Sequence, residues 1–163
     1  MTTQTREPDK RRSTEADERP TGADEPRLAA WSAFLHAHAR VTRLLERELQ
    51  AEESLALADY DVLVQLALAG DRRLRMSELA DRLLLSRSGI TRLVDRLERD
   101  GLVERMTCES DRRGQWAALT DAGHQRLRNA SPTHLRGVAE HFLDRIPHEE
   151  LETLRRTLER ITG

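Results

Sequence analysis

One stretch in the middle of the chain restricts the possible folds more than any other, because an amphipathic helix is followed at once by two short strands. Residues 86–100 favour a helix, since their apolar side chains recur every three or four positions. These side chains are Ile90, Leu93, Val94 and Leu97. Ser86 is suited to cap the start of this helix, and Gly101 to end it. Alternating patterns at residues 102–107 and 115–119 then flank a polar turn, as a β-hairpin requires.

Three further helices are expected before this stretch. Residues 27–50 carry apolar side chains on one helical stripe, and residues 58–69 form a second amphipathic segment. Gly70 follows it where a glycine commonly ends a helix. A short helix at residues 78–83 has Ser77 as its candidate cap. The short helix and the helix at residues 86–100 together predict a helix–turn–helix.

Two helices are expected after the hairpin. Thr120 is suited to cap a long helix that contains Pro132, and a proline inside a helix predicts a kink or a local break. Pro147 starts the last helix, whose apolar residues are spaced as in a coiled coil. These residues are Leu151, Leu154, Leu158 and Ile161. The fold class expected is therefore mainly α with a small β-wing, the α+β winged-helix arrangement.

The chain divides into three kinds of segment. Residues 1–26 carry twelve charged side chains and no aromatic residue, so they predict a disordered polar tail. Residues 57–119 form the expected winged helix-turn-helix lobe. Residues 27–56 and 120–163 form the helices at the two ends of the folded part. These helices are too few to build a hydrophobic core of their own. Such ends commonly pair with a second copy, which predicts a dimerisation region and a homodimer.

Composition excludes several classes of protein. The length of 163 residues fits one folded unit, and a single cysteine, Cys108, excludes an intrachain disulfide scaffold. No apolar run reaches the length of a membrane span, and the first 26 residues do not resemble a signal peptide. We therefore expect a cytoplasmic protein.

Arginine is the feature of the composition that points to a partner. The net charge is −2, but 26 of the 27 basic residues are arginine, since Lys10 is the only lysine. The guanidinium group of arginine can form paired hydrogen bonds with phosphate oxygens and guanine edges. A GC-rich genome would also raise the arginine content of a protein. The outer side of the helix at residues 86–100 begins with residue types that suit DNA. They are Ser86, Arg87, Ser88, Thr91 and Arg92.

The turn of the hairpin provides a second candidate contact with DNA. Arg112 and Arg113 stand side by side at its tip, where one of them can enter a narrow minor groove. Asp111 can hold a neighbouring guanidinium in place. A solvated amphipathic helix and an ordinary charged turn are the alternatives for each feature alone. Their joint occurrence favours double-stranded DNA as the partner.

These residues carry a resemblance to a known family. The run LLLSRSGITRLVDRLERDGLVERMTCESDRRGQWAALTDAG, residues 83–123, resembles the core of the multiple-antibiotic-resistance regulator (MarR) family. The resemblance implies a homodimeric winged-helix transcriptional regulator, commonly a repressor. It implies that the helix at residues 86–100 reads the major groove of a pseudo-palindromic operator, while Arg113 reaches the minor groove. Gln115 and Trp116 depart from the commonest family pattern. Packing on the helix below, solvent and DNA all remain open as the surroundings of Trp116.

The resemblance also implies release from DNA by a small, often phenolic effector bound between the dimer helices and the DNA-binding lobe. The polar or aromatic candidates there are Trp31, His38, Tyr60 and Asp61. Core packing is the alternative for the two aromatic rings. An activator or antirepressor without an effector, and a winged helix used only for protein contact, are the alternative functions.

Other chemistry finds little support in the sequence. His134, His141 and His148 recur every seven residues, but Pro147 interrupts them, so we expect no metal and no cofactor. Cys108 is expected to be an unreactive thiol. The chain has no glycine-rich phosphate loop, no nucleophile elbow and no helical zinc motif, so no enzyme is expected.

Overall fold

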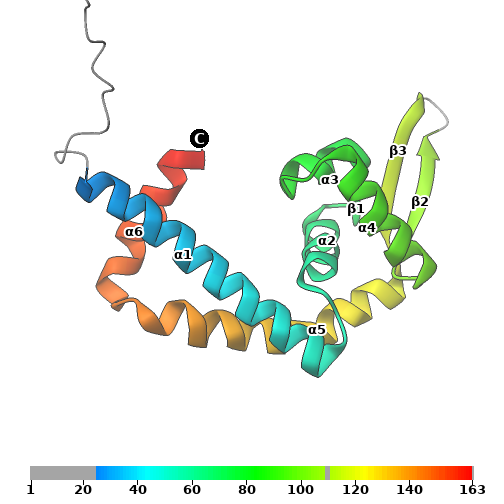
Figure 1. Ribbon diagram of the computed structural model, residues 1–163. Helices are drawn as coiled ribbons and strands as arrows, with labels where there is room; N and C mark the ends of the chain where they lie inside the picture. Colours follow the sequence, from blue (N-terminus) through cyan, green and yellow to red (C-terminus); the bar gives the residue numbers. More distant parts are fainter. Residues whose placement is uncertain (1–24, 109–110, 163) are drawn as a thin grey trace, which may run out of the picture. The chain divides into compact units, whose positions relative to one another are not determined.

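The computed structural model describes residues 25–108 and 111–162, with the side chains of all of these except residues 108 and 111–114. The elements follow one another as α1 (Glu25–Glu48), a π-helical segment η2 (Leu49–Glu53), α2 (Leu57–Leu68), β1 (Arg73–Arg75), α3 (Met76–Arg82), α4 (Arg87–Arg99), β2 (Val103–Cys108), β3 (Asp111–Leu119), α5 (Asp121–His141), the 3-10 turn η3 (Leu143–Arg145) and α6 (His148–Thr162). This mainly helical fold with a small sheet confirms the expected class (Figure 1).

Contacts divide the chain into two units, Met1–His36 and Ala37–Gly163. The second unit holds the sheet, the hydrophobic core and all helices after α1. The expected tail at residues 1–26 lies almost wholly outside the described residues, except that Glu25 and Pro26 already belong to α1. No helix among the described residues is long and apolar enough to cross a membrane.

The sheet has three antiparallel strands in the order β1-β3-β2. The expected hairpin is present, with Val103 opposite Leu119 and Met106 opposite Trp116. Strand β1 was not expected, because three residues are too short to show an alternating pattern. It pairs with the other edge of β3, with Arg75 opposite Trp116.

The core lies between the sheet and helices α2, α3 and α4, which stand beside it in Figure 1. Its largest fully buried side chains come from η2, these three helices and β2. They are Leu49, Val62, Leu63, Leu66, Leu79, Ile90, Val94, Leu97 and Val103. Leu127 and Ala130 extend the core into α5. The apolar face expected for α4 is therefore the face that anchors this helix.

Two of the expected helix caps are confirmed. The hydroxyl of Ser86 accepts a hydrogen bond from the Gly89 N–H at 3.1 Å, and that of Thr120 accepts one from the Gly123 N–H at 3.0 Å. Each bond satisfies a donor that the first turn of a helix leaves free. Gly101 follows α4 with φ +72°, a conformation that favours glycine.

Of three other local expectations, the cap at Ser77 was wrong. Ser77 lies inside α3, since the chain enters this helix directly from β1 at Arg75. Gly70 directly follows Ala69, the residue that caps the end of α2, as expected, although the left-handed conformation occurs two residues later at Arg72 with φ 53°. Helix α5 is continuous through Pro132, which excludes a local break there, and Pro147 precedes α6 as expected.

Helix α5 packs closely on the part of α1 that belongs to the second unit. A Cβ atom at Gly137 would stand 2.5 Å from Glu48 Oε2 and 2.7 Å from Leu45 Cδ2, so a larger residue there would displace the ends of these two side chains. Polar contacts extend the same interface, since Arg136 donates to Glu52 at 2.6 Å and His141 Nε2 lies 2.5 Å from Glu48 Oε1.

Candidate nucleic-acid interface

The N-terminal half of α4 presents a polar face to solvent. Its five candidate DNA contacts are all exposed: Ser86, Arg87, Ser88, Thr91 and Arg92. Within the described residues, the guanidinium groups of Arg87 and Arg92 form no hydrogen bond or ion pair. The Ser86 hydroxyl accepts the cap bond and lies 3.2 Å from the Ser88 hydroxyl. The helix therefore offers two guanidinium groups that have no partner in the described part of the chain, beside two hydroxyl groups.

An ion pair with a buried carboxylate and a partly exposed guanidinium fixes α4 to α2. Asp59 is 7% exposed, and its carboxylate accepts three hydrogen bonds from Arg96. The shortest joins Arg96 Nη2 to Asp59 Oδ1 at 2.6 Å. Hydrogen bonding to Asp59 raises the pKa of the Arg96 guanidinium above its ordinary value. This fork-shaped pairing restricts rotation of α4 about its axis, because both planar groups must stay aligned.

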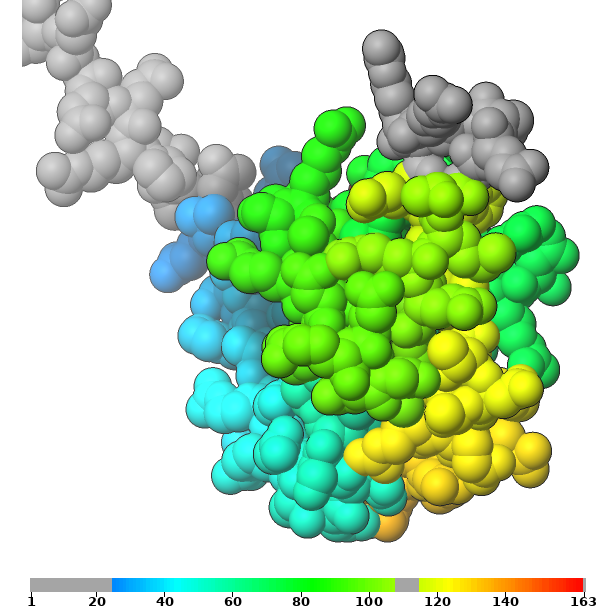
Figure 2. Space-filling model, turned by 90° about the vertical axis from the view of Figure 1, so that its right-hand side faces the viewer, coloured from blue at the N-terminus to red at the C-terminus, as the bar shows by residue number. Residues whose placement is uncertain are grey.

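A second arginine fixes the hairpin to α4. Arg105 of β2 donates to the Thr91 carbonyl at 3.2 Å and to Glu98 Oε2 at 3.3 Å. It also forms an ion pair with Asp95. One guanidinium thus compensates two carboxylates that would repel a phosphate backbone. Figure 2 shows α4 and β2 next to each other on one face of the molecule.

The tip of the hairpin is described only as backbone. Strand β3 begins at Asp111, whose partner in the register is Cys108, and the pairing shifts between Thr107 and Cys108. The side chains of Asp111, Arg112 and Arg113 lie outside the described residues, as does that of Cys108. The backbone places these residues at the end of the hairpin farthest from α5.

Trp116 lies on the face of the sheet that carries the arginines of β1. The guanidinium carbon of Arg73 is 5.5 Å from the centre of the Trp116 ring, and that of Arg75 is 5.2 Å away. These are cation–π distances. Trp116 is therefore half-buried and packs against arginines of the neighbouring strand.

The sequence pattern of the MarR family matches residues 54–114. The solved structure of AbsC, a MarR family regulator from Streptomyces coelicolor, is 36% identical with a TM-score of 0.78, covering 85% of this chain and 93% of AbsC. Sco3205 from the same organism, a MarR family regulator solved in complex with DNA, is also 36% identical with a TM-score of 0.78, covering 83% of this chain and 85% of Sco3205. The chain belongs to the MarR family of transcriptional regulators.

A curated relative agrees with this assignment over a shorter length. The regulator YkoM of Bacillus subtilis is 33% identical over 92 residues, which are 56% of this chain and 58% of YkoM. The MarR family is dimeric. The relatives named here are described as transcriptional regulators, and one of them was solved in complex with DNA.

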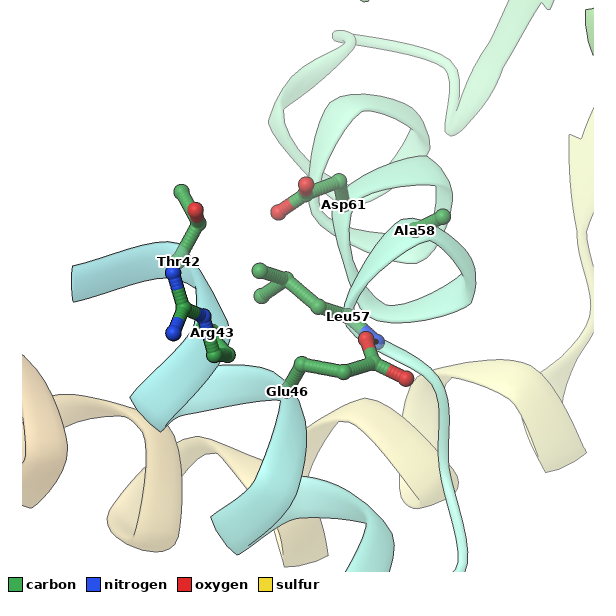
Figure 3. A pocket seen from close by; sticks show the side chains of 6 residues that line it. All are labelled: Thr42, Arg43, Glu46, Leu57, Ala58 and Asp61. Carbon is green, nitrogen blue, oxygen red and sulfur yellow. Dashed lines mark hydrogen bonds between the residues drawn. The ribbon is translucent and has the colours of Figure 1, made fainter. Parts of the chain in front are cut away.

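The structure has a hollow of about 390 Å³ between α1 and α2. Thr42, Arg43, Glu46, Leu57, Ala58 and Asp61 line it (Figure 3). Burial raises the pKa of the Asp61 carboxyl above its ordinary value, and the nearby charge of Glu46 adds to the effect. Glu46 Oε2 also accepts a hydrogen bond from the Leu57 N–H at 2.7 Å.

Of the four residues expected near an effector, Asp61 lines this hollow and the other three lie elsewhere. Tyr60 is buried, stacks on His134 at 4.3 Å between ring centres, and pairs its hydroxyl with that of Ser131 at 3.4 Å. Trp31 is exposed and stacks on Phe34 within α1. His38 is exposed on the same helix. Sequence reasoning missed Arg43 and Glu46, because only the packing of α1 on α2 brings them to Asp61.

The three histidines considered for a metal have separate surroundings. His134 packs against Tyr60, and burial lowers the pKa of its imidazole. His141 pairs with Glu48, and His148 begins α6. Within residues 25–108 and 111–162, the structure shows no group of three or more His, Cys, Asp or Glu side chains placed to hold a metal ion.

Proposed function

We propose that this chain binds a pseudo-palindromic operator as a homodimer, with α4 of each copy in the major groove. Two exposed arginines at the start of α4, free of any partner among the described residues, carry this proposal. Arg87 and Arg92 can each donate two hydrogen bonds to the O6 and N7 atoms of guanine. The hydroxyl groups of Ser86, Ser88 and Thr91 contact phosphates or base edges. Arg113 enters the adjacent minor groove, with Arg112 beside it and Asp111 orienting it.

The regions that we assign to dimerisation are residues 27–56 and 120–163, and residues 57–119 form the DNA-binding lobe. Several exposed apolar side chains of α1 and α6 support this assignment. They are Leu28, Trp31, Phe34, Leu35 and Ile161. Large apolar side chains left in water favour association, since their burial contributes about 1.5–3 kcal/mol each.

The regulatory activity that fits this arrangement is repression relieved by a small aromatic effector. The effector site we propose is the hollow at Asp61, where the polar side chains of Arg43 and Glu46 stand beside the apolar Leu57. The protein would act in the cytoplasm, together with its DNA, and would catalyse no reaction. Thermal denaturation with a panel of phenols tests the effector site, because a ligand bound to the folded protein raises its melting temperature.

Selection of bound sequences from random double-stranded DNA tests the operator. The expected result is an inverted repeat whose half-site centres lie about 10 bp apart, which is one helical turn. The double variant Arg87→Ala/Arg92→Ala should lose this enrichment. Arg128→Ala is the matched control, because Arg128 is exposed on α5 and forms no ion pair within the described residues. Selection that enriches no sequence with the unaltered protein would contradict the proposal.

A further inference from the structure

The turn between α3 and α4 contains an exposed leucine in an unfavourable backbone conformation. Leu84 has φ 53°, and the residue is 93% exposed. Among the described residues, only Ser54 and Arg72 share a positive φ without being glycine, and both are polar. Leu84 is thus an apolar side chain held in the left-handed region and directed into solvent.

Folding does not account for a leucine at this position. A left-handed conformation costs a residue with a Cβ atom about 1–2 kcal/mol, and glycine would occupy it without strain. The side chain recovers none of that cost, because almost no part of it is buried. The Leu84 N–H donates to the Asp81 carbonyl at 3.2 Å, and this backbone bond would form equally with glycine. A strained and exposed residue points to a role outside the chain.

The position of Leu84 indicates the partner. It stands two residues before Ser86, which caps α4, and three before Arg87. Leu85, which follows it, is 38% exposed and lies over the first turn of α4, because a Cβ atom at Gly89 would be 3.8 Å from Leu85 Cβ. The end of α4 that carries the hydroxyl and guanidinium groups therefore also carries an apolar edge.

The major groove offers one apolar group to such an edge. Among the four bases, only thymine presents a methyl group there, at C5, and apolar side chains contact it. We propose that Leu84 recognises a thymine of the operator by packing on this methyl group. The inference rests on the proposed function, since it requires that the start of α4 lies in the major groove.

Replacement of thymine by deoxyuridine tests the proposal, because the exchange removes only the methyl group. Starting from an operator obtained by selection, each thymine of one half-site is replaced in turn, and the dissociation constants are measured by fluorescence anisotropy. The unaltered protein should lose about fourfold in affinity at one position, the factor that corresponds to one buried methyl group. Leu84→Gly and Leu84→Asn should bind the two DNAs at that position equally.

Two controls keep the result specific. Leu84→Gly should melt no lower than the unaltered protein, because glycine relieves the strain, so weaker binding would not reflect unfolding. Leu68→Asn changes another leucine, 74% exposed at the end of α2, and should retain the fourfold discrimination. Discrimination that persists in both Leu84 variants, or that is absent from the unaltered protein, overturns the inference. If the unaltered protein selects no operator, this result contradicts the proposed function itself rather than the role of Leu84.

Discussion

Arg96 of α4 donates hydrogen bonds to both carboxylate oxygens of Asp59 on α2, with Nη2–Oδ1 at 2.6 Å and Nε–Oδ2 at 3.0 Å. The two side chains differ in exposure, at 43% for Arg96 and 9% for Asp59. Loss of Arg96 therefore leaves a buried carboxylate without a cation, whereas loss of Asp59 leaves an arginine that can turn into water. The pair joins the helix proposed to read DNA to the core beneath it.

Arg96→Met should consequently destabilise the protein more than Asp59→Asn does. We expect about 2–3 kcal/mol for Arg96→Met and about 1 kcal/mol for Asp59→Asn, below the range for fully buried pairs because Arg96 is partly exposed. Urea denaturation of both variants and of the double variant gives the coupling energy. Equal losses, or a double variant equal to the sum of the two, would contradict this account of the pair.

Arg105→Ala should weaken DNA binding although Arg105 itself is not assigned to DNA. The change frees the carboxylates of Asp95 and Glu98, whose charges then repel the phosphates. Anisotropy titrations should show a loss that shrinks as salt increases, because salt screens exposed charges. Adding Asp95→Asn should restore part of the affinity. A loss that neither salt nor Asp95→Asn reduces would mean that Arg105 acts only through folding.

Arg87→Ala and Arg113→Ala should weaken DNA binding in different ways. An arginine that binds guanine contributes about 1–3 kcal/mol and sets base preference, so Arg87→Ala should relax the selected sequence. An arginine in the minor groove is attracted by the negative potential there and by the adjacent backbone, so Arg113→Ala should weaken binding on all sequences and lower the salt slope by about one. Binding measured on the operator and on single-base variants separates the two. Identical profiles for both variants would argue against the groove assignments.

Trp116→Leu should loosen the contact between β1 and β3. Two guanidinium groups, of Arg73 and Arg75, lie over the ring, and each such contact at an exposed site contributes about 0.5–1 kcal/mol. The expected loss in urea denaturation is about 1–2 kcal/mol, and Trp116→Phe should lose less because it keeps an aromatic face. Variants as stable as the unaltered protein would show that these contacts contribute nothing.

Asp61→Asn should stabilise the protein at neutral pH. The pKa of Asp61 is raised in the folded state by burial and by Glu46, so the charged form destabilises the fold above that pKa. A neutral side chain removes this penalty. The advantage of the variant should shrink as pH falls through the raised pKa and disappear below 3.8, the ordinary value for this carboxyl. Thermal denaturation from pH 7 to pH 3.5 or below tests the sign, and an advantage that grows toward acid would contradict it.

The sequence predicts the local features of this fold well. Ser86 and Thr120 cap their helices as expected, because a cap depends on residues three positions apart. The apolar spacing of Ile90 and Val94 likewise predicts which face of α4 is buried. The hairpin follows from its two alternating strands and its polar turn.

Features that depend on distant parts of the chain could not be predicted. Asp59 and Arg96 are separated by 37 positions, and both look like ordinary surface residues of amphipathic helices. Strand β1 exists only because β3 provides a free edge. A leucine at position 84 does not predict a left-handed turn, since leucine disfavours that conformation.

The most direct test of the central claim is anisotropy of the purified protein with DNA from upstream of its own gene and with a scrambled sequence, at 50 mM and 200 mM salt. A regulator whose arginines neutralise about 6–10 phosphates should bind the upstream DNA selectively and lose about 10³- to 10⁵-fold in affinity between these conditions. Arg87→Ala/Arg92→Ala should abolish the selectivity, and Arg128→Ala should preserve it. Weak binding that is equal on both DNAs, together with a failure to enrich any sequence from random DNA, would contradict the account.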